Sequence, residues 1–196
     1  MSRRLALFLA IGALAIAGGW TLFIGLPRWS APKPAAAPAV AAAATAEPER
    51  KITATLYYVS DDGTELVGLQ REVPFGEPVL DQARRIVDAQ VAPAAAPLVS
   101  AIPAGTTLRS LFMTNKGDVF VDLTGDVRSK HSGGALDELF TVYTIVNALT
   151  VNLPAITRVQ ILIDGKEADT LAGHVDLRHP LQKNLKWTAV QTDNDK

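Results

Sequence analysis

The chain has 196 residues, of which 48% are hydrophobic, contains no cysteine, and carries a formal net charge of -1 at pH 7. The charge divides unevenly, because residues 1–50 carry +3 and the remainder carries -4. A mildly acidic domain without a basic stripe argues against nucleic acid as a partner, and the lack of cysteine excludes disulfides and a lipid-modified amino-terminal cysteine.

The first segment is an apolar run, Leu5 to Leu26, that contains no charged residue. At ~1.5 Å per helical residue, about 22 residues cross the ~30 Å hydrocarbon core of a bilayer. Arg3 and Arg4 precede the run, so the positive-inside rule favours a cytoplasmic amino terminus and a periplasmic domain. We therefore predict a transmembrane signal anchor over residues 1–26 of a single-pass inner (cytoplasmic) membrane protein. The alternative is a signal peptide cleaved at Ala15-Ile16-Ala17, although apolar residues continue past that site.

The second segment, residues 27–50, is rich in alanine and proline. Pro32, Pro34, Pro38 and Pro48 interrupt any continuous helix and favour extended backbone. We predict a spacer between the membrane and the domain that follows.

The domain is predicted over residues 51–183 and begins with two strands. Ile52 to Val59 is rich in β-branched and aromatic residues and ends at an Asp-Asp-Gly turn, and Leu66 to Val73 forms its partner. Pro78 to Val91 carries apolar residues at helical spacing. Residues 94–101 are predicted to form a loop.

A second pair of strands follows, Leu108 to Thr114 and Val119 to Leu123, joined by an Asn-Lys-Gly-Asp turn. The longest predicted helix covers about Ala135 to Leu153 and presents a broad apolar face. A strand over Arg158 to Ile163 then turns at Asp-Gly towards a short partner at Ala168 to Leu171.

The predicted order is therefore β-β-α-β-β-α-β-β, and residues 184–196 form a C-terminal tail. Paired strands separated by helices favour an α+β fold, with a mixed β-sheet and two helices packed on one face. One transmembrane helix precedes this fold.

Three stretches of this domain resemble a known family: Tyr143 to Thr150, Arg158 to Gly165 and Leu171 to Leu181. Together with Val119 to Leu123 and the helix start at Gly133-Gly134, they occur in the order typical of the GerMN domain. That family is named for a sporulation and spore germination protein. The resemblance implies an extracytoplasmic, non-enzymatic module that binds a ligand or partner at the cell envelope, similar to the ring-building modules of secretion-like complexes.

Few residues carry a recognisable chemistry. His131, His174 and His179 lack the HEXXH arrangement, so we interpret them as loop histidines and predict no metal site. Ser132-Gly133-Gly134 has neither the form of a nucleophile elbow nor the Lys-Ser/Thr ending of a phosphate-binding loop. We predict no catalytic residue and no cofactor.

Asp122 and Asp126 are candidates for a paired-carboxylate site. However, Asp126 follows a glycine in a predicted turn, and Asp122 alternates with Val121 and Leu123 as an outward strand position would. We therefore interpret both as solvated or capping carboxylates.

Asn147 places an amide amid the apolar surface of the long helix. That amide either caps backbone groups or contacts the polar groups of a ligand. If the domain holds a ligand in a groove near this helix, we predict Asn147, Gln160 and Asp122 as contacts.

These observations predict a membrane-anchored, extracytoplasmic, non-catalytic binding or assembly module of the bacterial cell envelope. The alternative is a small envelope hydrolase that acts on peptidoglycan through His174 or Asp122. The expected partner is an envelope protein or a cell-wall component, with weak self-association allowed but a large ring of identical subunits disfavoured. Lys166-Glu167 is expected to protect a sheet edge from pairing.

Overall fold

The computed structural model describes residues 50–189. The predicted anchor at 1–26, the linker up to residue 49 and the end of the tail lie outside the described residues. Between residues 50 and 189, no helix combines the length and the apolar composition that crossing a bilayer requires. The anchor and its orientation therefore stay predictions.

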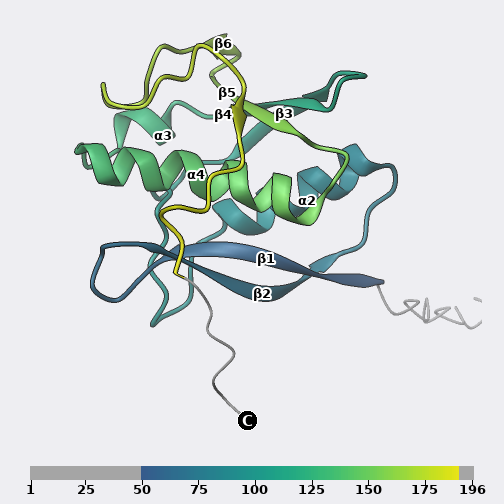
Figure 1. Cartoon of the computed structure of the whole chain (residues 1–196), viewed down its shortest axis with the longest axis horizontal. Helices are drawn as coiled ribbons and strands as arrows, with labels where there is room; N and C mark the ends of the chain where they lie inside the picture. The colour runs from purple at the N-terminus through teal and green to yellow at the C-terminus, as the bar shows by residue number, and fades with distance from the viewer. Residues whose placement is uncertain (1–49, 190–196) are drawn as a thin grey trace, which may run out of the picture. The chain divides into compact units, whose positions relative to one another are not determined.

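The described chain begins with a β-hairpin (Figure 1). β1 (Lys51–Val59) pairs antiparallel with β2 (Leu66–Pro74) in a register that runs without interruption along both strands. Successive side chains of a strand point to opposite faces, and Ala54 and Leu56 accordingly lie in the core. The two strands are confirmed to within one residue at each end.

Two long helices follow the predicted boundaries closely. α2 (Val79–Val91) buries Ala83, Ile86 and Val87, which recur at helical spacing. α4 (Ala135–Asn152) is more deeply enclosed, because every residue from 144 to 149 is buried. A helix that is buried on nearly all sides needs neighbours on more than one face.

The larger sheet has five strands in the order β3-β4-β5-β6, with β7 also paired to β5. β4 and β5 are parallel, and the chain crosses between them through the short helix α3 (Asp126–Ser129) and α4. The other pairs are antiparallel, so the sheet is mixed. Its strands are β3 (Leu108–Met113), β4 (Asp118–Leu123), β5 (Arg158–Ile163), β6 (Lys166–Glu167) and β7 (Leu181–Gln182).

The α+β class is confirmed, but the prediction of one sheet is wrong. The strands form two separate sheets, β1-β2 and β3-β4-β5-β6 with β7. Both helices contact strands of both sheets, so they lie between the hairpin and one face of the larger sheet (Figure 1). The apolar side chains of β4 and β5 that face the helices, Val119, Val121, Leu123, Val159 and Ile161, are almost fully buried.

Side-chain amides explain why β1 does not join the larger sheet. The Gln90 amide accepts a hydrogen bond from Tyr57 N at 2.8 Å and donates one to Tyr57 O at 2.8 Å. Asn152 binds Thr55 in the same way, with both distances at 2.8 Å. These two helix residues occupy the hydrogen-bonding positions that a neighbouring strand would use.

The prediction of a last strand at Ala168 to Leu171 is also wrong. The tight Asp164-Gly165 turn places Lys166 and Glu167 directly opposite β5, and these two residues form β6. Pairing ends there because the following backbone turns inward, where Ala168 and Leu171 are buried as part of a loop.

We expect Gln90→Leu to lower the free energy of unfolding by about 2–4 kcal/mol, because it leaves two buried backbone groups of Tyr57 without partners. Urea unfolding of a soluble form that starts at residue 47 measures this change. The control, Gln70→Leu at an exposed position of β2, should change stability by less than about 0.5 kcal/mol. Equal effects of the two substitutions would contradict the role assigned to the Gln90 amide.

Candidate functional site

Asn147 is fully buried in α4, and both ends of its amide are bonded. Nδ2 donates to Asn184 O at 2.8 Å, and Oδ1 accepts from Asn184 N at 3.0 Å. The amide therefore caps backbone groups, the first of the two roles predicted for it.

Gln160 makes a similar connection from β5. Its Nε2 lies 3.4 Å from Leu177 O and 3.3 Å from Arg178 O. Asn147 and Gln160 thus both hold the segment after residue 176 against the domain. Their direct contact with a ligand stays a prediction, and both amides already bond to backbone groups of the same chain.

Of the two roles predicted for Asp122, solvated or capping, the capping role is confirmed and the solvated role is wrong, because this carboxylate is only 4% exposed and binds the backbone of Gly165. It accepts hydrogen bonds from Arg109 Nε at 3.1 Å, Ser110 Oγ at 3.3 Å and Gly165 N at 2.7 Å. Strand alternation correctly places Asp122 and Val121 on opposite faces of the sheet. However, Arg109 and Ser110 contact Asp122 on its own face, so that face is covered as well. Arg109 also reaches Asp164 at 3.0 Å and joins the two carboxylates.

Asp126 stands apart from this cluster. It occupies the first turn of α3 and forms an ion pair with Lys130 at 2.9 Å, with both side chains partly exposed. The interpretation of Asp126 as a solvated or capping carboxylate is confirmed, but the turn predicted there is the start of the short helix α3. Asp122 instead shares Arg109 with Asp164, which was not among the residues predicted from the sequence.

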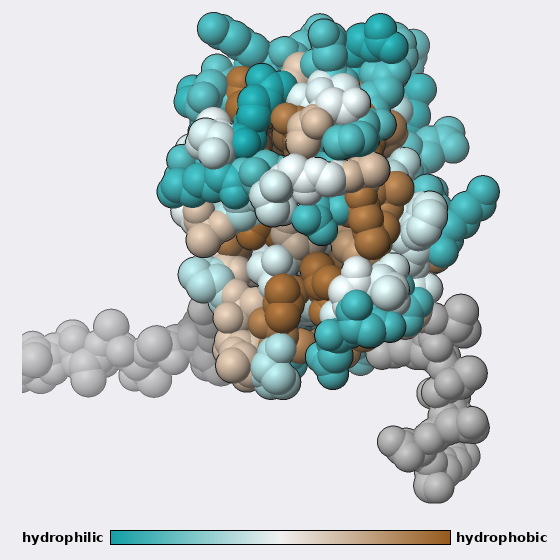
Figure 2. All heavy atoms as spheres, turned by 90° about the vertical axis from the view of Figure 1, so that its left-hand side faces the viewer, coloured by the Kyte–Doolittle hydropathy of each residue, from teal (hydrophilic) through white to brown (hydrophobic). Residues whose placement is uncertain are grey.

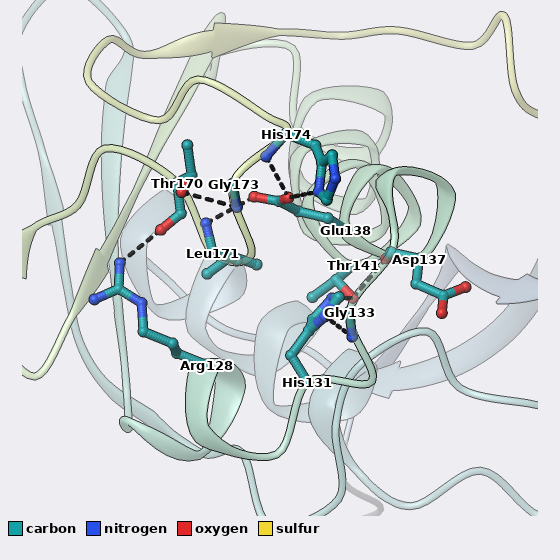
Figure 3. A network of polar contacts seen from close by, with 10 residues as sticks. All are labelled: Arg128, His131, Gly133, Asp137, Glu138, Thr141, Thr170, Leu171, Gly173 and His174. Atoms are coloured by element: carbon teal, nitrogen blue, oxygen red, sulfur yellow. Dashed lines mark hydrogen bonds and ion pairs between the residues drawn. The ribbon is translucent and has the colours of Figure 1, made fainter.

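A buried acid, Glu138, lies at the centre of a polar network that was not predicted from the sequence (Figure 3). Glu138 belongs to the first turn of α4 and has no exposed surface. Its Oε1 accepts from Leu171 N at 2.8 Å, and its Oε2 accepts from His174 N at 2.8 Å and lies 3.0 Å from His174 Nδ1. The loop at residues 170–175 therefore folds around one carboxylate.

Burial raises the pKa of Glu138, but the backbone N–H groups of Ala172, His174, Leu171 and Val175 favour the charged form more strongly. The net result is a pKa below the ordinary value of 4.5. Glu138 thus stays ionised at neutral pH and acts as an acceptor for the loop. The positive end of the α4 dipole favours the same charge state.

Two sequence signals were available for this network. Glu138 interrupts an apolar face near a helix start, and Gly173 lies in the loop with a φ of +101°, where a backbone without a side chain is favoured. Neither signal indicates that the two segments meet, since 36 residues separate Glu138 from His174.

A second set of polar contacts involves His131. Gly133 N donates to His131 Nδ1 at 3.0 Å, so the ring carries its proton on Nε2, which lies 3.2 Å from Thr141 Oγ1. The Thr141 hydroxyl in turn lies 2.6 Å from Ala101 O and donates to it. These contacts connect the start of α4 with the loop that follows α2.

Beside this connection lies a groove with a volume of about 880 Å³, which we call the 92–108 groove. The end of α2, the loop at residues 92–108 and residues 130–132 form its walls. Its lining is mainly apolar, with a few polar groups, and includes Val91, Leu98, Val99, Ile102, Lys130 and His131. Figure 2 shows the face that carries α3 and the start of α4, with hydrophobic side chains gathered between hydrophilic ones.

The three histidines lie in loops, as interpreted from the sequence. In the part of the chain that the structure describes, no group of three or more His, Cys, Asp or Glu side chains is placed to hold a metal ion. His174 is the histidine that accompanies a buried acid, and its own ring is 44% exposed.

We expect Glu138→Gln to destabilise the domain by about 2–4 kcal/mol at pH 7, because the amide nitrogen cannot accept the backbone N–H groups that now face a carboxylate. His174→Ala removes one partly exposed ring but leaves the backbone donors, so its effect should be below about 1 kcal/mol. Urea unfolding measures both.

The wild-type chain and the Glu138→Gln variant also test how the stability of the domain depends on pH. A carboxylate whose folded pKa is lowered stabilises the fold above its ordinary pKa of 4.5, and this contribution is lost as the pH falls through the lower folded value. The wild-type chain should therefore lose this part of its stability in acid. The Glu138→Gln variant should lack this stabilising contribution at every pH and so show no such loss. Identical acid profiles would contradict the assigned charge state.

Comparisons with known proteins agree with this architecture. The profile of the family "Germane: Sporulation and spore germination" matches residues 55–169, more than half of the chain. The tandem GerMN domains of the sporulation protein GerM from Bacillus subtilis share the fold at 18% identity and a TM-score of 0.50, over 69% of this chain and 46% of that one. The first GerMN domain of GerM alone gives 16% identity and a TM-score of 0.48, over 68% and 96%.

A search among curated proteins finds no match. The family match covers both helices, the hairpin β3-β4 and strand β5. It also includes Glu138, Asn147 and Gln160, which hold the loops in place. The chain therefore belongs to the Germane family of sporulation and spore germination domains, the GerMN family that its sequence resembles.

Proposed function

We propose that this chain is a membrane-anchored, extracytoplasmic, non-catalytic module that binds or assembles with a component of the bacterial cell envelope. The proposal rests on what the buried polar side chains bind. Glu138, Asn147 and Gln160 all bind backbone groups of the chain's own loops. Polar side chains that bind the chain's own backbone hold the loops in one conformation. A surface that is already ordered loses less conformational entropy when a partner binds.

The 92–108 groove is the contact surface in this proposal. It is hollow and mainly apolar, and Val99 in its lining is 54% exposed. Pockets of this size and lining are typical of ligand and partner sites. Asn147, Gln160 and Asp122 lie outside the lining of this groove and hold the segments at residues 184, 177–178 and 165 in place. The expected partner is an envelope protein or a cell-wall component.

The linker at residues 27–50 completes the proposal. A spacer between anchor and domain confines the domain near the membrane and raises its effective concentration towards targets in the same layer. A modest affinity at the groove is then sufficient for stable association.

The alternative is a small envelope hydrolase that acts through His174 or Asp122, and the structure adds Glu138 as the acid that lies 3.0 Å from His174 Nδ1. A general acid or base works best with a pKa near the working pH. The pKa of Glu138 is shifted downward instead, and its oxygens accept the backbone N–H groups of Leu171 and His174. This environment suits a structural carboxylate better than a proton donor.

The proposed topology predicts that a reporter fused after Lys196 is active only when the reporter works outside the cytoplasm. The physical reason is the uncharged run Leu5–Leu26 with Arg3 and Arg4 ahead of it. Fusions of alkaline phosphatase and of a cytoplasm-specific reporter measure this. Activity of the cytoplasmic fusion alone would contradict the orientation, and a mature chain that begins near Gly18 would establish cleavage in place of anchoring.

The proposed binding role predicts that a soluble form starting at residue 47 sediments with isolated cell envelopes without releasing wall fragments. Val99→Asp should weaken this co-sedimentation at least about tenfold, because a charge at an apolar contact must be desolvated on binding. Val79→Asp is the matched control, since Val79 is also exposed but lies outside the groove.

Equal binding by the two variants would argue against the groove. Release of fragments that His174→Ala abolishes would favour the hydrolase.

A further inference from the structure

Several strand edges of the described domain are occupied or protected. The outer edge of β1 is bonded by Gln90 and Asn152, and one end of β2 pairs with residues 187–189. β6 ends the larger sheet with two exposed charged residues, Lys166 and Glu167, as expected from the sequence. Charges and covering segments are the usual ways in which proteins prevent edge-to-edge pairing.

β3, at the other end of the larger sheet, lacks this protection over its last residues. Thr114 N bonds to Asp118 O, and bonded pairs alternate in an antiparallel ladder, so Phe112 bonds to Phe120. The backbone N–H and C=O groups of Leu111 and Met113 then point away from the sheet. Across residues 50–189, no backbone hydrogen bond to Leu111 or Met113 comes from outside the ladder.

A large apolar side chain accompanies this open edge. Phe112 is 58% exposed and lies opposite Phe120, so two aromatic rings occupy neighbouring strands on the same face. The tip of the β3-β4 hairpin extends beyond the body of the domain in Figure 1.

We propose that a second copy of this chain pairs with β3 through its own β3, antiparallel and about a two-fold axis at Phe112. In this register Leu111 of each copy lies opposite Met113 of the other, and the four open backbone groups of each edge form hydrogen bonds. The two Phe112 rings meet across a close, non-hydrogen-bonded pair. A symmetric pairing of this kind closes on itself and gives a dimer without further growth.

The side chains near the axis favour a second copy. Leu111 faces Met113 of the other copy, so apolar side chains meet on both sides of Phe112, and Ser110 lies opposite Thr114. The regular part of the pairing therefore contains no opposed like charges, as a stable cross-strand pairing requires. Arg109, at the irregularity of β3, and the turn residues Asn115 and Lys116 lie outside this regular part.

This inference goes beyond the proposed function, since it involves neither the groove nor an envelope partner. Because the chain has no cysteine, single cysteines introduced into the full-length chain report the register directly. With mild oxidation in membranes from cells that produce the chain, Phe112→Cys should form a disulfide-linked dimer. Its two Cα atoms would be ~4.5 Å apart, within disulfide range.

Asn115→Cys is the matched control in the same exposed hairpin. The register separates the two copies of residue 115 by six residues, or ~20 Å at ~3.4 Å each, which is beyond disulfide reach. It should therefore cross-link only at the background level of Gln70→Cys on β2. Equal cross-linking at 112 and 115, none at 112, or cross-links from 112 only to other proteins would each overturn the proposal.

A second measurement does not depend on disulfides. In sedimentation of the purified full-length chain, Phe112→Lys should raise the dimer dissociation constant at least about tenfold, because two lysines would face each other at the axis. Phe112→Tyr should preserve the dimer, and Val99→Asp in the groove should leave it unchanged. A chain that is monomeric throughout, or a Phe112→Lys variant that dimerises like the wild type, would overturn the inference.

Discussion

The structure depends on one requirement, that backbone N–H and C=O groups enclosed by the fold must find partners. Helix α4 meets this requirement for several segments at once. Its polar side chains bind backbone groups of β1 through Asn152, of the 170–175 loop through Glu138, and of the C-terminal segment through Asn147. Thr141 of the same helix binds the loop after α2 through Ala101 O. A single helix thereby organises chain segments that are far apart in sequence.

These polar residues also define how α4 is oriented. A helix with apolar residues on nearly all sides can rotate about its axis with little loss of buried area. Each amide or carboxylate restricts that rotation, because a misplaced polar group in the core costs about 1–3 kcal/mol. The cost of burying Glu138 is offset by several N–H donors, so the residue contributes to the uniqueness of the fold more than to its net stability.

Local features of the sequence predicted most of the elements. The β-branched and aromatic residues of β1 and the Asn-Lys-Gly turn before β4 are signals contained within a few residues, and the helical spacing in α2 spans only thirteen. The assignment of strands to sheets was not predictable in this way. It depends on Gln90 and Asn152, whose partners lie 33 and 97 residues away.

The candidate site shows the same division. Alternation predicted which side of β4 Asp122 faces, but not that Arg109, Ser110 and Gly165 cover it there. Glu138 has the position of an ordinary acid in a first helical turn, where the helix dipole alone explains it. Only the folded loop gives this acid its function, because the donors come from a segment with no local pattern of its own.

The hairpin β1-β2 has a mechanical consequence. Residue 50 leads directly into β1, whose hydrogen bonds to β2 run perpendicular to the strand. A pull along β1 from its amino end therefore loads these bonds together in shear, and the bonds from Gln90 and Asn152 share the force on the other edge. A domain attached through this strand resists extension with a whole row of bonds, whereas peeling the strand away would break them one at a time.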